Sequence, residues 1–156
     1  MLFRSYMAIY LFMTLGTFAA ILMMRRQGKS VETIADLAGL GLTDKGMAFF
    51  LAMMMFSLAG IPPLGGFFAK FYVFSAAIDA GLYWLAVLGV LASCVAAYYY
   101  LRIIKLMYFD ASAPAFDRAA PLLRAVLVIA ALAVMLFPLY PSPLITAALA
   151  AAKSLF

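Results

Sequence analysis

Charge is scarce in this 156-residue chain: aspartate, glutamate, lysine and arginine together make up 11% of it, and histidine is absent. Soluble domains carry charge at about 25% of their positions, so an ordinary water-facing exterior is excluded. Without histidine, and with acids only in loops or near the ends of apolar runs, we expect no metal or haem site in this chain. No glycine-rich nucleotide motif follows a predicted strand, so we expect no bound nucleotide cofactor either.

Cysteine is also nearly absent. The single one, Cys94, cannot form an internal disulfide, so it leaves the redox compartment open. The net charge of +5 does not indicate a nucleic-acid partner, because in so apolar a chain the cations must be read loop by loop.

What the chain has instead is apolar sequence, at 69% of its residues. Because a membrane-spanning helix needs roughly 20 apolar residues, four spans fit this length. We predict an all-α, polytopic membrane protein forming one membrane domain, with the lipid bilayer as its surroundings. The predicted spans are residues 5–24, 47–80, 82–105 and 122–140, and a surface amphipathic helix is predicted over about 30–40.

The run 47–80 is too long for one straight span, so it either crosses once with a break or crosses twice. A single crossing places eight lysines and arginines on one side of the membrane and two on the other, whereas two crossings split them evenly. The positive-inside rule favours the uneven arrangement. We therefore predict that the second span is discontinuous at Gly60–Gly66. Loops 25–46 and 102–121 are predicted to be cytoplasmic, and the C-terminus outside.

Two consecutive prolines, Pro62 and Pro63, interrupt this span. Because neither has an amide hydrogen, the carbonyls of Leu58 and Ala59 lose their helical partners. A break at this depth is tolerated only where protein or water covers it, and broken helices of this kind occur at transporter ion sites. The residues expected to form the break and to line water are Leu58, Ala59, Gly60, Pro62, Pro63, Gly65 and Gly66.

Lys70 lies one helical turn beyond this break. A charged lysine at mid-membrane costs roughly 2.5–3.5 kcal/mol on insertion scales, and burial favours its neutral amine. Lysine, unlike arginine, can change its charge state, so the break, its glycines and Lys70 together favour a functional site over a purely structural one. Two alternatives stay open: a fixed ion pair between Lys70 and an acid outside this chain, and a simple kink or tight turn at Pro62–Pro63.

These residues resemble a known family. The motif SLAGIPPLGGF at Ser57–Phe67, followed by KFYVF at Lys70–Phe74, is similar to the antiporter-like membrane subunits of respiratory complex I. The similarity is greatest to the subunit N family of NADH–quinone oxidoreductase and covers nearly the whole chain. Supporting stretches are Tyr10–Phe18, Ile34–Leu40, Gly81–Leu85 and Ala97–Arg102.

The resemblance implies a proton-translocating subunit that couples quinone reduction to proton pumping in a bacterial inner membrane. This chain would be the last third of a fourteen-helix subunit, and the upstream two-thirds would be among its partners, beside the other membrane subunits. The resemblance implies that Lys70 is a proton relay, one member of a line of buried lysines and a glutamate used in proton translocation. NADH, FMN, iron–sulfur clusters and quinone would be bound by other subunits, so that no redox step occurs in this chain.

Two other functions share these features. A related cation/proton antiporter or a membrane-bound hydrogenase subunit would also have a broken helix with a lysine. A structural membrane module without a transport role would predict that replacing Lys70 has no effect.

Overall fold

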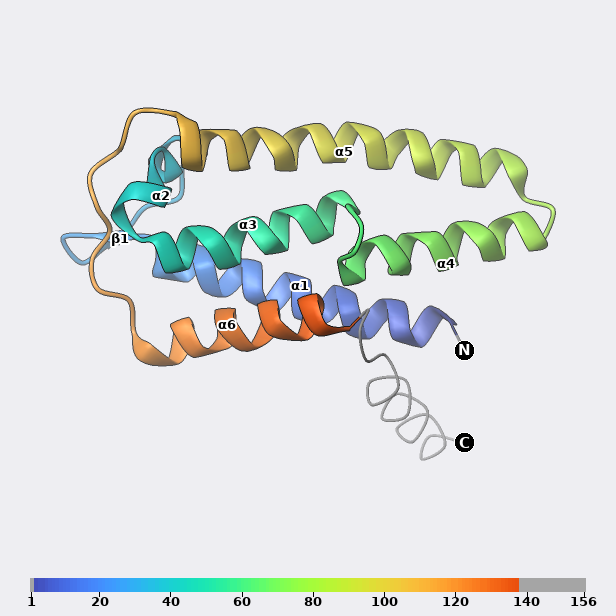
Figure 1. Cartoon of the computed structure of the whole chain (residues 1–156), viewed down its shortest axis with the longest axis horizontal. Helices are drawn as coiled ribbons and strands as arrows, with labels where there is room; N and C mark the ends of the chain where they lie inside the picture. Colours follow the sequence, from blue (N-terminus) through green and yellow to red (C-terminus); the bar gives the residue numbers. More distant parts are fainter. Residues whose placement is uncertain (1, 138–156) are drawn as a thin grey trace.

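The computed structural model describes residues 2–137, and their side chains from Met7 onward. The described chain is mostly helical, as the sequence predicts (Figure 1). Its elements are α1 (Leu2–Met23), β1 (Arg25–Arg26), β2 (Lys29–Ser30), the 3₁₀-helix η1 (Ile34–Leu37), α2 (Leu40–Thr43), α3 (Lys45–Ala59), α4 (Gly65–Asp79), α5 (Tyr83–Phe109) and α6 (Pro121–Leu136).

The long helices form an elongated bundle in which α3 and α4 lie end to end (Figure 1). Helix α5 runs back alongside both of them, while α1 and α6 pack together on their other side. With 27 residues, α5 is about 40 Å long, and α3 and α4 have 15 residues each. One long helix therefore matches the combined length of the two short ones.

The core of the bundle lies between α1, α3 and α6. Ile9, Met54 and Leu127 are each no more than 2% exposed. Gly16 lets α1 approach its neighbours closely, because a Cβ there would lie 3.0 Å from both Ala130 Cβ and Met54 Sδ. The side chains of α5, by contrast, are mostly exposed: Trp84 is 81% exposed.

The two longest connections meet at one end of the bundle, the left end in Figure 1. The carboxylate of Asp117 accepts hydrogen bonds from the amides of Gln27 and Gly28, at 3.2 and 2.9 Å. The amide of Ala113 donates to the Ala38 carbonyl at 2.9 Å. The segment after α1 and the segment after α5 therefore lie at the same end of the bundle.

The amphipathic helix predicted over residues 30–40 is wrong. Ser30 pairs with Arg25 in a β-hairpin whose strands have two residues each, and only η1 and α2 are helical in this region. The helix cannot continue through Gly39, which has a φ of +65°. A Cβ on Gly39 would lie 2.4 Å from the Cα of Ser112, so contact with the second loop fixes a shape that local periodicity does not reveal.

Among the described residues, one helix is both long and apolar enough to cross a membrane, namely α5. Residues Met7–Met23 of α1, together with α3 and α6, are apolar but shorter. The predicted last span ends at residue 140, so its final residues lie outside the described part of the chain, as does the C-terminus.

Candidate functional site

The break between α3 and α4 begins at Gly60, before the prolines are reached. Gly60 adopts a left-handed conformation with φ +87°, and its amide donates to the Ser57 carbonyl at 3.0 Å. The amide of Ile61 donates to the Phe56 carbonyl at 3.1 Å. This pair of bonds is a Schellman motif, which satisfies carbonyls that the end of a helix would otherwise leave open.

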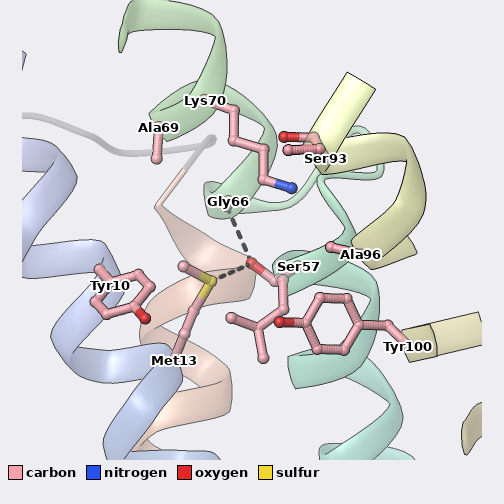
Figure 2. Close-up of a pocket in the computed structure, with 11 residues that line it drawn as sticks. Tyr10, Met13, Ser57, Gly66, Ala69, Lys70, Ser93, Ala96 and Tyr100 are labelled. Carbon is pink, nitrogen blue, oxygen red and sulfur yellow. Dashed lines mark hydrogen bonds between the residues drawn. The ribbon is translucent and has the colours of Figure 1, made fainter. Parts of the chain in front are cut away.

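Helix α4 begins with help from a side chain of α3. The amide of Gly66 donates to Ser57 Oγ at 3.0 Å, and the Ser57 hydroxyl donates to the sulfur of Met13 on α1 at 3.1 Å (Figure 2). Ser57 is fully buried. Because the first amides of a helix lack partners in their own helix, Ser57 acts as a cap for α4 across the break.

The glycines of the break allow close packing. A Cβ on Gly66 would lie 1.9 Å from the carbonyl oxygen of Ser57, so the two helix ends approach at a distance that only glycine permits. A Cβ on Gly65 would lie 3.2 Å from the Val134 carbonyl oxygen on α6.

Lys70 reaches back over the break towards α3. Its Nζ donates to the Ala59 carbonyl at 3.1 Å, which is one of the two carbonyls that the prolines were predicted to leave open. A Cβ on Gly60 would lie 3.1 Å from Lys70 Cδ, so Gly60 makes room for the lysine stem. Within residues 2–137 no carboxylate forms an ion pair with Lys70, because the three ion pairs there use other cations.

Lys70 lines two clefts. The first has a volume of about 240 Å³ and lies between α1, α3, α4 and α5 (Figure 2). The second has a volume of about 250 Å³ and lies between the end of α3, α4 and α5. The first cleft is lined by Tyr10, Met13, Ser57, Leu58, Gly66, Ala69, Lys70, Ala92, Ser93, Ala96 and Tyr100. The second is lined by Ala59, Gly60, Phe67, Lys70, Phe71, Phe74, Val90, Ser93, Cys94 and Ala97.

The seven residues predicted to form the break fall into three groups, and Lys70 is considered with them. Leu58 and Gly66 line the first cleft, and Ala59 and Gly60 line the second. Lys70 lines both. The remaining three lie at or next to the break but line neither cleft: Pro62, Pro63 and Gly65.

The sequence did not single out Ser57 as a cap. A serine inside an apolar helix commonly bonds to its own helix, as Thr17 does here to the Met13 carbonyl. The partner of Ser57 lies nine residues further along the chain and beyond the break, so no local pattern indicates it. In the described part of the chain, no group of three or more histidine, cysteine or acidic side chains is placed to hold a metal ion.

A bundle of apolar helices, one of them interrupted beside a partly buried lysine, is the architecture of a membrane transport protein. The chain belongs to the NADH:quinone oxidoreductase/Mrp antiporter transmembrane family, whose family model matches residues 1–96. The resemblance to this family is therefore confirmed.

Within the family the chain is similar to NADH-quinone oxidoreductase subunit N. It is 67% identical to that protein from Beijerinckia indica over 152 residues, covering 97% of this chain and 32% of the relative. It is 62% identical to subunit N from Methylobacterium nodulans, covering 97% of this chain and 31% of the relative. The chain thus spans about a third of the length of these relatives.

A solved structure shows the same arrangement of helices. Respiratory complex I from Thermus thermophilus with bound aureothin contains a chain that is 28% identical to this one, with a TM-score of 0.75. The match covers 89% of this chain and 33% of that chain.

Proposed function

We propose that this chain is part of a proton-translocating, antiporter-like subunit of NADH-quinone oxidoreductase, in which Lys70 carries the proton. The observation on which this proposal rests is the position of Lys70. Its amine donates to the carbonyl that ends α3, and Lys70 lines two clefts. Coupling of quinone reduction to pumping would then involve the other subunits, which would bind NADH, FMN, iron–sulfur clusters and quinone.

The proposed membrane topology has four crossings: α1, then α3 and α4 together, then α5, then α6. Each half of the interrupted helix, at 15 residues, is about 22 Å long and too short for a hydrocarbon core of about 30 Å. Two separate crossings would place the loop after α1 and the loop after α5 on opposite sides of the membrane. Contact between these loops at one end of the bundle supports a single crossing. The lysines and arginines of these loops favour a cytoplasmic side by the positive-inside rule, in a bacterial inner membrane.

The proposed step at Lys70 is a reversible protonation. The neutral amine takes a proton from a water in one cleft and becomes an ammonium group, which returns a proton to a water in the other cleft. In the ammonium state, three N–H groups need acceptors, and the Ala59 carbonyl accepts from one of them. The break supplies this acceptor because a continuous helix would have used the carbonyl internally.

A related cation/proton antiporter is the second candidate, since the matching family model also covers Mrp antiporters. The relatives named above are subunits N of the quinone oxidoreductase, at 67% and 62% identity. This identity favours the first candidate.

The test is Lys70→Met in the full-length subunit, assembled in its complex in membrane vesicles. We expect fewer protons pumped per electron transferred from NADH to quinone, with normal assembly. Lys105→Met is the matched control, because Lys105 pairs with Asp110 at the end of α5 and lines neither cleft. Unchanged pumping in the Lys70 variant would contradict the proposal.

A further inference from the structure

Lys70 is not alone at the boundary between the two clefts. The linings of the clefts share two residues, Lys70 on α4 and Ser93 on α5. Otherwise the linings differ in character. The first cleft has the hydroxyl groups of Tyr10, Ser57 and Tyr100, whereas the second is lined mainly by aromatic and aliphatic side chains.

The hydroxyl of Ser93 is available for a new hydrogen bond. Within residues 2–137 it has no hydrogen-bond partner, although it is only partly exposed. The hydroxyls of Thr14 and Thr17 on α1, by contrast, each donate to the carbonyl four residues earlier, at 2.8 Å. Figure 2 shows Ser93 on α5 beside the lysine side chain, at the rim of the first cleft.

The bond between Lys70 and Ala59 leaves part of the lysine unsatisfied. An ammonium group has three donors, and the Ala59 carbonyl accepts from one. In a site of low dielectric, an unpaired donor on a charged group is costly. The flexible stem of lysine lets the amine move towards another acceptor, and the acceptor that borders both clefts is Ser93.

We propose that Ser93 is the second hydrogen-bond partner of Lys70 and conducts its proton into the first cleft. The Nζ–H bond breaks as Ser93 Oγ takes that proton, and the original hydroxyl proton of Ser93 passes to a water in the cleft. Lysine is left as the neutral amine, serine is unchanged, and the water has become hydronium. This inference rests on the proposed function of Lys70 and adds a direction to it, from the break towards the hydroxyl-lined cleft.

Ser75 on α4 provides a comparison. Its hydroxyl also has no hydrogen-bond partner within residues 2–137, but it lines neither cleft. Its replacement should therefore leave proton transfer unchanged.

The experiment compares Ser93→Ala, Ser93→Thr and Ser75→Ala in the full-length subunit, assembled in its complex in membrane vesicles. Subunit content, NADH-to-quinone electron transfer and protons pumped per electron are measured for each variant. We expect Ser93→Ala to lose most of the pumping that Lys70→Met removes, while Ser93→Thr and Ser75→Ala pump normally. Ser93→Val, which matches threonine in shape without the hydroxyl, replaces the alanine variant if that variant does not assemble.

Normal pumping by Ser93→Ala or Ser93→Val overturns the inference, and so does an assembled Ser93→Thr variant that pumps as poorly as Ser93→Ala. Lys70→Met separates this failure from failure of the proposed function. If Lys70→Met loses pumping while Ser93→Ala does not, only the role of Ser93 is rejected. If Lys70→Met pumps normally, both proposals are rejected.

Discussion

Ser57 Oγ, on α3, accepts a hydrogen bond of 3.0 Å from the amide of Gly66, the second residue of α4. The same serine donates to the sulfur of Met13 on α1. One buried side chain thus connects the two halves of the interrupted helix with a third helix. Lys70 lies one turn further along α4, so the position of its amine relative to Ala59 depends on how this junction is held.

Replacing Ser57 by alanine should destabilise the junction. The amide of Gly66 would lose its partner, and a buried polar group without one costs about 1–3 kcal/mol. Thermal unfolding of the purified full-length subunit in detergent measures this effect. Ser75→Ala is the control, since Ser75 lies on α4 without a hydrogen bond among the described residues. Equal melting temperatures for the two variants would contradict a capping role for Ser57.

The contact between the loop after α1 and the loop after α5 should depend on pH through Asp36. A hydrogen bond from the hydroxyl of Thr33, and then the guanidinium of Arg26, hold the pKa of Asp36 below its ordinary value of 3.8. Because the folded-state pKa is the lower one, the ionised carboxylate stabilises the fold at pH values above 3.8. That contribution is lost as the pH falls through the folded-state pKa. Arg26 also lies over the ring of Phe116, with its Cζ 5.0 Å from the ring centroid, so it connects Asp36 with the second loop.

Asp36→Asn imitates the protonated acid at neutral pH. We expect faster amide hydrogen exchange in the hairpin and in η1 of the full-length subunit, with α3 and α6 unaffected. Glu32→Gln removes a nearby acid that has no ion pair within residues 2–137, and it should leave exchange unchanged. If both variants exchange at the wild-type rate, the ion pair between Asp36 and Arg26 does not hold the loops together.

The sequence was sufficient to predict the order of the long helices and the place of the break. The order of the helices follows from apolar runs of helical length, and the place of the break follows from the two prolines with their neighbouring glycines. Both are local patterns in the sequence. Local rules also predicted that the prolines would leave the Ala59 carbonyl open. They did not predict that Lys70 Nζ would donate a hydrogen bond to this carbonyl.

The rest depends on contacts between segments far apart in the chain. Ser57 is a cap only because α4 begins beside it, and the region around Gly39 is irregular because Ser112 packs against it. The helical spacing of Ile34 and Leu37 suggested an amphipathic helix, but these residues occupy a short 3₁₀-helix held by the second loop. The shared position of Ser93 between the clefts likewise arises from the packing of α5 against α4.

Gly66 should be the glycine least tolerant of substitution at the break. In Gly66→Ala, the new methyl carbon would lie 1.9 Å from the carbonyl oxygen of Ser57, so one of the two helix ends must move. Overpacking in a core typically costs about 1–3 kcal/mol, and a backbone atom cannot yield as a flexible side chain does, so we expect a cost at the upper end of this range. Lys70 would move with α4, so proton pumping by the assembled complex should fall together with the melting temperature.

Gly46→Ala is the matched control for this substitution. Gly46 lies in the first turn of α3, and its added Cβ would make only an ordinary contact, at 3.5 Å from Asp44 Oδ1. Alanine is favoured over glycine in a helix by up to about 1 kcal/mol, so this variant should be as stable as the wild type or slightly more stable. Thermal unfolding in detergent and proton pumping in vesicles are measured for both variants. A Gly66→Ala variant that matches Gly46→Ala in both would show that the close approach of α3 and α4 is not required for the position of Lys70.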